Sequence, residues 1–364
     1  KKAVIRNMEL LIIDEVSMLR ADLLDAMDFM MQTIRKNNQA FGGVQVLFIG
    51  DLLQLPPVIR EDEWRTLSRY YKGKFFFHAH VIEKSPPIYI ELSKIFRQTD
   101  DTFISVLNNL RVNKITAKDI QVLNQFFQPK FDLKANKGYI TLTTHNHKAD
   151  TINAQSLADL EGEIFVYRSD VIGDFPDKIF PLEEKLELKV GAQVMFIKND
   201  DSSTVKNPNG TGLLKRWVNG TIGTVVDLPS SGGVVVEVDG ETFDVGRSTW
   251  EKVRYEIDEQ FDEALGRVKE VLVAVPLAEF QQIPLRLAWA VTVHKSQGQT
   301  YDEVVIDMGR GAFSPGQTYV ALSRVRSLDG LYLTRAIRMS DIMVDADVLR
   351  FMGGSSNSAV AKLF

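Results

Sequence analysis

Two short apolar runs near the start of the chain each end in polar residues. Residues 10–13 are followed by Asp14 and Glu15, and residues 46–49 lead to a turn with Asp51 and Gln54. A short apolar run bounded by polar or turn residues is typical of a strand buried in a parallel sheet. The pattern therefore predicts two buried strands with polar side chains at their carboxyl ends.

Apolar residues between these two runs recur at helical spacing. They are Leu23, Leu24, Met27, Met30, Met31 and Ile34. This period predicts a helix whose apolar stripe packs in the core. Phe41-Gly42-Gly43 then ends the helix and restarts the sheet. Two further amphipathic helices are expected over residues 100–111 and 117–127.

The last third of the chain pairs a polar cluster with an arginine. Residues 291–298 read Val-Thr-Val-His-Lys-Ser-Gln-Gly, residues 304–307 form a strand-like run, and Arg324 follows the apolar segment 319–322, where we expect a helix. Nucleic-acid-dependent ATPases need such a combination, because a DNA-binding segment must communicate with a phosphate-sensing arginine. The pattern favours a DNA helicase motor.

The middle of the chain has a different pattern. Residues 191–197, 219–226 and 233–238 resemble short strands, and Asp239-Gly240 suits a tight hairpin turn. Short strands with glycine-rich turns predict a small β-barrel, although a β insertion without a nucleic-acid role stays possible. Its weak candidates for DNA contact are Arg216, Trp217 and Lys252.

The composition of the chain limits its domain number, its compartment and its mode of DNA binding. The chain has 364 residues, 45% of them hydrophobic and 25% charged, which predicts a globular protein of two or three domains. The absence of cysteine excludes disulfides and thiolate zinc sites and fits a reducing compartment, so we expect a cytoplasmic location. A net charge of −5 implies that DNA is bound in a local groove.

The acidic pair has a specific chemistry. A strand ending in Asp14-Glu15 places one carboxylate where it can hold Mg²⁺ and the next where it can orient or deprotonate water for ATP hydrolysis. An acidic pair is common by chance, but the second polar strand end supports the reading. There the Gln54 amide can bond a γ-phosphate or the attacking water.

Several motifs in order resemble the PIF family of DNA helicases in superfamily 1B, which is related to RecD. The resemblance covers about residues 1–345. The motifs are Asp14-Glu15-Val16-Ser17-Met18, Phe41-Gly42-Gly43-Val44-Gln45, residues 50–58, residues 92–98, Thr143-Thr144-His145-Asn146, and the two motifs of residues 291–298 and 319–326.

The resemblance implies an α/β fold of RecA-like P-loop NTPase domains with parallel sheets and an inserted SH3-like β-barrel. The expected division places the first RecA-like domain at 1–95, the second at 96–190 and 284–345, the barrel at 191–283, and a linker or tail at 346–364. The resemblance also implies ATP, Mg²⁺, single-stranded and forked DNA, 5′-to-3′ movement, a monomer, and roles in replication, repair and telomere maintenance.

The resemblance assigns roles to individual residues. It implies catalytic roles for Glu15, Gln54, Arg97 and Arg324, which also bind ATP together with Asp14 and Gly298, and it makes Asp14 the metal ligand. Arg97 and Arg324 would act as arginine fingers on the γ-phosphate. The implied DNA contacts are Thr144, His145, Asn146, Thr292, His294 and Lys295.

One departure from the family pattern concerns phosphate binding. The sequence contains no Gly-x-x-x-x-Gly-Lys-Ser/Thr loop, and its one Gly-Lys pair, Gly73-Lys74, lacks the following hydroxyl residue. In the family that loop precedes the acidic strand. We therefore interpret the chain as a fragment without its amino-terminal segment, and expect it to hydrolyse ATP poorly by itself.

Two rival hypotheses come from other classes of protein. A non-catalytic DNA-binding or scaffold module is made more credible by the missing phosphate loop. A metal-dependent nuclease is suggested only loosely by Pro176-Asp177 followed by Glu183-Glu184-Lys185, because these residues are close together in an expected loop.

Overall fold

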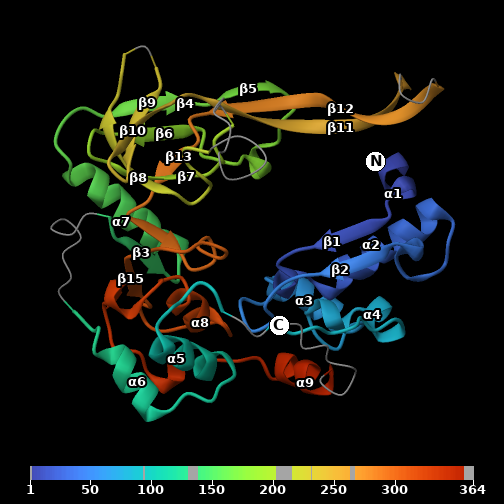
Figure 1. Cartoon of the computed structure of the whole chain (residues 1–364), viewed down its shortest axis with the longest axis horizontal. Coiled ribbons are helices and arrows are strands. Elements are labelled where there is room, and N and C mark those ends of the chain that lie inside the picture. The colour runs from blue at the N-terminus through green and yellow to red at the C-terminus, as the bar shows by residue number, and fades with distance from the viewer. Residues whose placement is uncertain are drawn as a thin grey trace. The chain divides into compact units, whose positions relative to one another are not determined.

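The structure is a computed structural model that describes residues 2–92, 95–129, 138–201, 215–230, 232–262 and 267–355. The chain divides into two compact units (Figure 1). The first unit combines residues 1–131 with residues 293–364, and the second unit comprises residues 132–292. Each unit is described by itself. No helix in the described ranges is long and apolar enough to cross a membrane.

The described residues of the first unit form α-helices, 3-10 helices (η) and four short strands. They are α1 (Lys2–Asn7), β1 (Leu10–Ile13), η1 (Val16–Met18), α2 (Ala21–Arg35), η2 (Ala40–Gly43), β2 (Gln45–Phe48), α3 (Glu61–Leu67), η3 (Phe76–His78), α4 (His80–Lys84), α5 (Asp101–Arg111), α6 (Ala117–Asn124), β15 (Val304–Asp307), α8 (Gln317–Leu322), η5 (Leu328–Gly330), β16 (Leu331–Leu333), η6 (Met339–Asp341) and α9 (Ala346–Ser355).

The second unit is mainly β-structure. Its elements are β3 (Ile140–Thr143), α7 (Asn146–Asp159), β4 (Phe165–Arg168), β5 (Asp170–Gly173), η4 (Asp177–Ile179), β6 (Lys185–Leu188), β7 (Gln193–Phe196), β8 (Ile222–Asp227), β9 (Val234–Val238), β10 (Glu241–Val245), β11 (Ser248–Asp262), β12 (Arg267–Gln282), β13 (Leu285–Leu287) and β14 (Ala290–Thr292).

Strands β1 and β2 confirm the two apolar runs, and they pair in parallel with Ile13 opposite Phe48. The prediction that both strands are buried was wrong. Exposed and partly buried positions alternate along each strand, and Ile12 is 55% exposed and Leu47 46% exposed. One face packs on the core of the first unit, while the apolar side chains of the other face are about half exposed.

Helix α2 confirms the helix predicted between these strands. Leu24 and Met31 are buried in a core that also contains Phe41 and the phenylalanines of residues 75–77. The apolar stripe is only partly core, however, because Leu23 and Met30 are 48% and 45% exposed. The buried arc of the helix is narrower than the apolar stripe in the sequence, which periodicity alone does not reveal.

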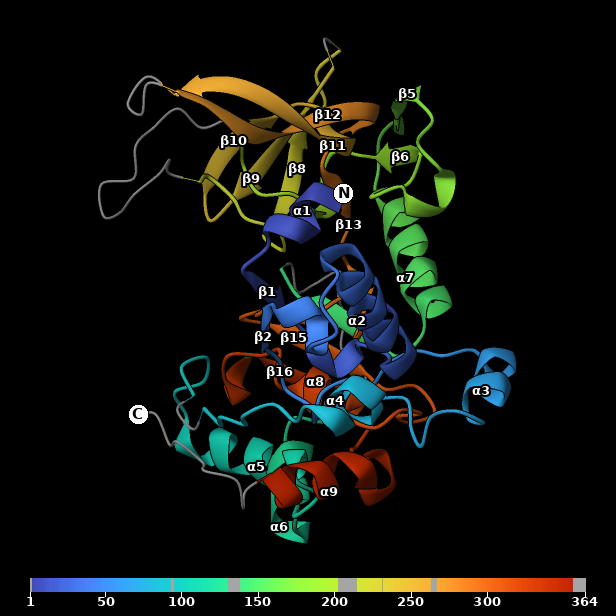
Figure 2. The ribbon, with the colours of Figure 1, turned by 90° about the vertical axis from the view of Figure 1, so that its right-hand side faces the viewer.

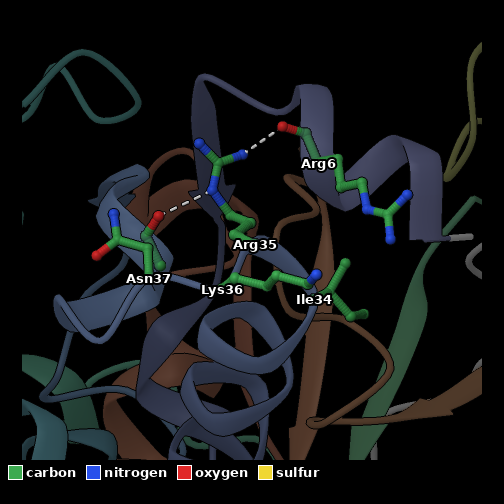
Figure 3. A pocket seen from close by; sticks show the side chains of 6 residues that line it. Arg6, Ile34, Arg35, Lys36 and Asn37 are labelled. Carbon is green, nitrogen blue, oxygen red and sulfur yellow. Dashed lines mark hydrogen bonds between the residues drawn. The ribbon is translucent and has the colours of Figure 1, made fainter.

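Arg35 fixes the amino-terminal helix to the end of α2. Its guanidinium donates hydrogen bonds to the carbonyl oxygens of Ile5, Arg6, Met8 and Gly42. The Arg35 side chain lines a pocket of about 440 Å³. Figure 3 shows how it lies among the other residues of this pocket. These bonds satisfy carbonyl groups at the end of α1, where the helix dipole also favours a cation.

Helices α5 and α6 and strand β15 lie where the sequence predicts them, and β15 pairs in parallel with β16. The linker expected at 346–364 was partly wrong. Residues 346–355 form α9, whose Val348 is buried against the core that holds α2. Apolar residues before the glycines at 353 and 354 provide this packing face. Residues 356–364 lie outside the described residues.

The three strands predicted in the middle of the chain are confirmed as β7, β8 and β9. They belong to an antiparallel sheet with the order β10-β9-β8-β7-β13. Asp239 and Gly240 both have positive φ, 51° and 82°, and form the two-residue turn between β9 and β10. This geometry is the type I′ turn that suits strand twist. The long hairpin of β11 and β12 was not predicted (Figure 1 and Figure 2).

The predicted boundary between the second RecA-like domain and the barrel, at residue 191, would cut through one hydrophobic core. Tyr167 and Leu188 precede that position, yet they pack with Val194 and Val236 in the core of the antiparallel sheet. Strands β4 and β6, of four residues each, were not predicted, because so short a run shows no clear period. The proposed three-domain division stays a prediction.

Candidate nucleotide and nucleic-acid site

The acidic strand end has an unusual backbone. Glu15 lies in the left-handed region, with φ 50° and ψ 43°, and its N–H donates to Asp14 Oδ1 at 2.8 Å. Asp14 is exposed and Glu15 is half-buried. A non-glycine residue held at positive φ stores backbone strain, which is often found at functional sites. The turn therefore presents two carboxylates in different surroundings.

Glu15 contacts the polar segment from the other end of the chain. Its Oε2 accepts a hydrogen bond from Gln297 Nε2 at 2.9 Å. The Oε1 of Gln297 is buried and has no partner within the described residues. The sequence argument overlooked Gln297 and favoured Gly298 beside it. An amide next to a glycine in a polar motif was the available signal.

Arg97 and Arg324 meet at Ser323. Arg97 Nη1 donates to the carbonyl oxygen of Ser323 at 3.3 Å, and Gln98 Nε2 donates to the same oxygen at 3.2 Å. Gln98 also donates to Val325 O at 3.1 Å. The structure thus brings the two predicted arginine fingers together from segments more than two hundred residues apart.

Arg324 is almost fully buried, with 1% of its surface exposed. Its guanidinium donates to Val320 O at 3.0 Å, to Gln299 O at 3.2 Å and to Ser323 Oγ at 2.8 Å. Burial, and then the nearby charge of Arg97, lower the pKa of Arg324 to about 10, although Glu15 partly offsets this. A second cation beside a buried one favours binding of an anion such as phosphate.

Gln54 lies on the turn that follows β2. Its side chain is half-buried, and its Nε2 lies 3.4 Å from Asp51 Oδ2. Gly298 has a φ of 79°, and a Cβ built there meets nothing within 4 Å. Its backbone therefore leaves room for a ligand, and its place in the nucleotide site stays a prediction.

Four of the predicted DNA contacts belong to the second unit. Thr144 and Thr292 are buried, with 5% and 4% of their surface exposed, whereas His145 and Asn146 are exposed. Thr144 Oγ1 lies 2.8 Å from His145 Nδ1. The two threonines thus have little surface for a ligand, and Thr144 is placed to orient His145.

The other two predicted contacts belong to the first unit. Lys295 is exposed, and His294 is half-buried in a pocket of about 560 Å³. Burial lowers the pKa of His294, which favours a neutral ring. Trp64 and Phe313 line the same pocket, and Phe313 is 57% exposed. The sequence argument overlooked these two aromatic residues, because neither lies in a polar motif.

The weak candidates in the β insertion have structural roles. Trp217 is 7% exposed and stacks on Phe196 in the core. Arg216 forms a two-pronged ion pair with the buried Asp200, and Lys252 donates to Asp174 O.

The nuclease hypothesis gains no support, since no three His, Asp or Glu side chains in the described ranges gather to hold a metal ion.

Parallel strand pairs define an α/β protein, and an acidic strand end and two converging arginines form its candidate site. A family model described as PIF1-like helicase matches residues 1–121. ATP-dependent DNA helicase Pif1 of Bdellovibrio bacteriovorus is 32% identical over 354 residues, which cover 95% of this chain and 70% of that protein. The chain therefore belongs to the PIF1-like helicase family, and the predicted family is confirmed.

Further relatives support membership in the same family. Human ATP-dependent DNA helicase PIF1 is 34% identical over 357 residues, covering 95% of this chain and 49% of that protein. The chain thus spans about half the length of several curated relatives. The crystal structure of Bacteroides sp Pif1 in complex with ADP-AlF4 matches with a TM-score of 0.82 and 35% identity, covering 100% of this chain and 79% of that chain. The predicted RecA-like fold class is confirmed.

A second solved structure, Bacteroides Pif1 bound to ssDNA, matches with a TM-score of 0.70 and 35% identity, covering 100% of this chain and 79% of that chain. It shows that a relative binds single-stranded DNA.

Proposed function

We propose that this chain is the motor part of an ATP-dependent DNA helicase that moves along single-stranded DNA and unwinds duplex DNA. The observation that carries the proposal is the contact between Glu15 and Gln297. It joins the acidic strand end, where hydrolysis would occur, to the polar segment that contains His294 and Lys295. Family membership and the solved relatives with ADP-AlF4 and ssDNA support it.

On the nucleotide side, Glu15 orients and deprotonates the attacking water, and Gln54 contacts the γ-phosphate or that water. Arg97 and Arg324 stabilise the charge that develops on the transferred phosphoryl group. The proximity of the two arginines supports this role. The open backbone of Gly298 contacts the nucleotide.

Asp14 would hold Mg²⁺. One exposed carboxylate fits this ion, because Mg²⁺ usually takes one or two protein carboxylates and completes its shell with water and substrate phosphates. When bound, Mg²⁺ would neutralise phosphate charge.

On the DNA side, His145, Asn146 and Lys295 offer exposed polar groups to the strand. Thr144 and Thr292 are buried and act as supporting residues within the second unit. His294 shares its pocket with Trp64, whose ring suits stacking with a base.

Other features stay proposals too. We propose 5′-to-3′ movement, a preference for single-stranded and forked DNA, and action as a monomer. The expected division into residues 1–95, 96–190 with 284–345, and 191–283 is retained on the basis of the family resemblance. A cytoplasmic location rests on the absence of cysteine.

The alternative is a DNA-binding module without catalysis. The observation that favours it is the absence of a phosphate-loop motif from this sequence. Such a module binds DNA with the same affinity whether or not nucleotide is present. A motor must instead couple the two sites, so that nucleotide changes DNA affinity.

The test measures binding of fluorescent oligothymidine by anisotropy. Two proteins are compared, this chain and the same chain extended upstream to include a phosphate-binding loop, each with and without Mg²⁺ and a nonhydrolysable ATP analogue. We expect nucleotide to change the Kd of the extended form by at least fivefold. Lys295→Ala should weaken DNA binding, whereas the exposed Lys118→Ala serves as the matched control. Identical affinity under all conditions would favour the module.

A further inference from the structure

Asp51 braces the turn that carries Gln54. Its Oδ1 accepts a hydrogen bond from the N–H of Leu53 at 3.2 Å, and its Oδ2 lies 3.4 Å from Gln54 Nε2. An aspartate that accepts bonds from the next residues stabilises a tight turn. Asp51 therefore controls both the backbone and the side-chain direction of Gln54.

Two side chains from distant segments bind the same carboxylate. Tyr319 on α8 donates its hydroxyl to Asp51 Oδ2 at 3.1 Å. Arg111, the last residue of α5, lies with Nη2 3.4 Å from Asp51 Oδ1. Asp51 thus joins the Gln54 turn to two helices of the first unit.

This cluster is largely shielded from water. The side chains of Arg111 and Asp51 are 24% and 19% exposed. Burial, followed by the charge of Asp51, raises the pKa of Tyr319 far above its ordinary value, so its hydroxyl stays a donor at neutral pH. Burial opposes the charge on Arg111, but Asp51 together with Tyr319, Glu91 and Tyr89 outweighs it, so the pKa of Arg111 is raised. Partly buried contacts of this kind are stronger than surface ion pairs.

An independent contact links the same two segments. Gly316, just before α8, has a φ of 74°, and a Cβ at this position would lie 2.2 Å from the backbone carbonyl oxygen of Gln54. Only glycine fits both the backbone angle and the close approach. The Gln54 turn therefore packs directly on the start of α8.

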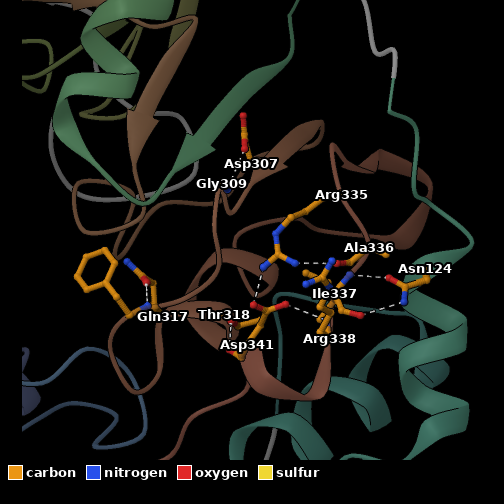
Figure 4. A network of polar contacts seen from close by, with 11 residues as sticks. Asn124, Asp307, Gly309, Gln317, Thr318, Arg335, Ala336, Ile337, Arg338 and Asp341 are labelled. Carbon is orange, nitrogen blue, oxygen red and sulfur yellow. Dashed lines mark hydrogen bonds and ion pairs between the residues drawn. The ribbon is translucent and has the colours of Figure 1, made fainter.

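The start of α8 is itself held in place, as Figure 4 shows. Thr318 donates its hydroxyl to the carbonyl oxygen of Asp341, whose carboxylate binds Arg335 and the N–H of Arg338. Helix α8 ends at Leu322, two residues before Arg324. A rigid helix thus separates the Asp51 contact from the buried arginine.

We propose that Tyr319 and Arg111 are positioning residues of the nucleotide site, which fix Gln54 relative to Arg324 by binding Asp51. The proposal rests on the function proposed above. Neither residue contacts the nucleotide. Their loss should slow the chemical step, because small misplacements of catalytic groups are costly, and should leave binding of ATP and DNA nearly unchanged.

The experiment uses the extended form and measures single-strand-stimulated ATP hydrolysis. We expect Tyr319→Phe and Arg111→Met each to lower kcat by about 10- to 100-fold, with KM for ATP within about threefold of wild type. Arg111→Lys should restore part of the rate. Tyr70→Phe is the matched control, since Tyr70 is 69% exposed. Rates of both variants within twofold of wild type would overturn the proposal.

A double variant separates positioning from a general structural role. If Tyr319 acts through Gln54, adding Tyr319→Phe to Gln54→Ala should change kcat by less than about twofold, because the effects of coupled residues are not additive. If Tyr319→Phe lowers kcat as much in the Gln54→Ala background as in the wild-type background, the proposal is contradicted. If the extended wild type does not hydrolyse ATP at all, the proposed function fails. Amide hydrogen exchange of residues 52–55 then still tests the bracing, with about tenfold faster exchange expected in Tyr319→Phe.

Discussion

Replacing Arg324 by methionine tests whether this buried cation serves catalysis or stability. Its pKa falls from 12.5 to about 10, and with about 1.4 kcal/mol per unit the charge costs the folded state about 3 kcal/mol. Its three hydrogen bonds, at about 1.5 kcal/mol each for a charged donor, slightly outweigh that cost. We therefore expect Arg324→Met to lower the free energy of unfolding by only about 1–2 kcal/mol.

The effect on catalysis should be far larger. An arginine finger contributes about 10³-fold or more to phosphoryl transfer, so kcat of the extended form should fall by about that factor. Urea unfolding and single-strand-stimulated ATP hydrolysis are measured on the same preparations. Arg326→Met is the control, because the Arg326 side chain is 59% exposed and forms a surface ion pair with Asp302. A free energy of unfolding lowered by more than about 4 kcal/mol would show that Arg324 serves mainly stability. A kcat within about tenfold of wild type would show that it is not an arginine finger.

Three further predictions concern other residues. Gln297→Leu should lower kcat at least about tenfold, because Glu15 loses its orienting hydrogen bond, and unchanged steady-state turnover would exclude that role. Trp217→Ala should cost about 3–5 kcal/mol in urea unfolding, since Trp217 lies in the core, and a cost below about 1 kcal/mol would show that its packing matters little. Burial lowers the pKa of His294 below 6.5, so the unfolded chain binds the proton more readily and stability falls as pH drops below about 6.5. His294→Gln should lose less stability than wild type between pH 7.5 and 5, and an equal loss would contradict the assignment.

Much of the fold could be predicted because local patterns reflect it. The strand of residues 10–13, the helix Ala21–Arg35 and the Asp239-Gly240 turn follow from period and turn chemistry. Burial was harder to predict. Leu23 and Ile12 are apolar yet exposed, since the neighbours that cover a side chain are set by tertiary packing. Helix α9 was missed because its glycines resemble a linker.

The candidate site was only partly visible in the sequence. Glu15 and Arg324 could be selected from the order of the motifs. ATP hydrolysis needs a carboxylate after a buried strand and an arginine that reaches the phosphate, and these residues follow such segments. Gln297 and Tyr319 were missed, because their roles depend on contacts across more than two hundred residues. Sequence spacing does not encode such contacts. Trp217 shows the opposite error. Its aromatic side chain made it a candidate for DNA contact, but it is buried in the core.

We propose that Glu15 is the catalytic base of a DNA-stimulated ATPase. The most direct measurement is ATP hydrolysis with and without single-stranded DNA by this chain, by the chain extended upstream with a phosphate loop, and by Glu15→Gln in the extended form. We expect turnover only in the extended wild type, increased by DNA. Hydrolysis by the extended Glu15→Gln variant at the wild-type rate, or no hydrolysis by any form, would contradict the account.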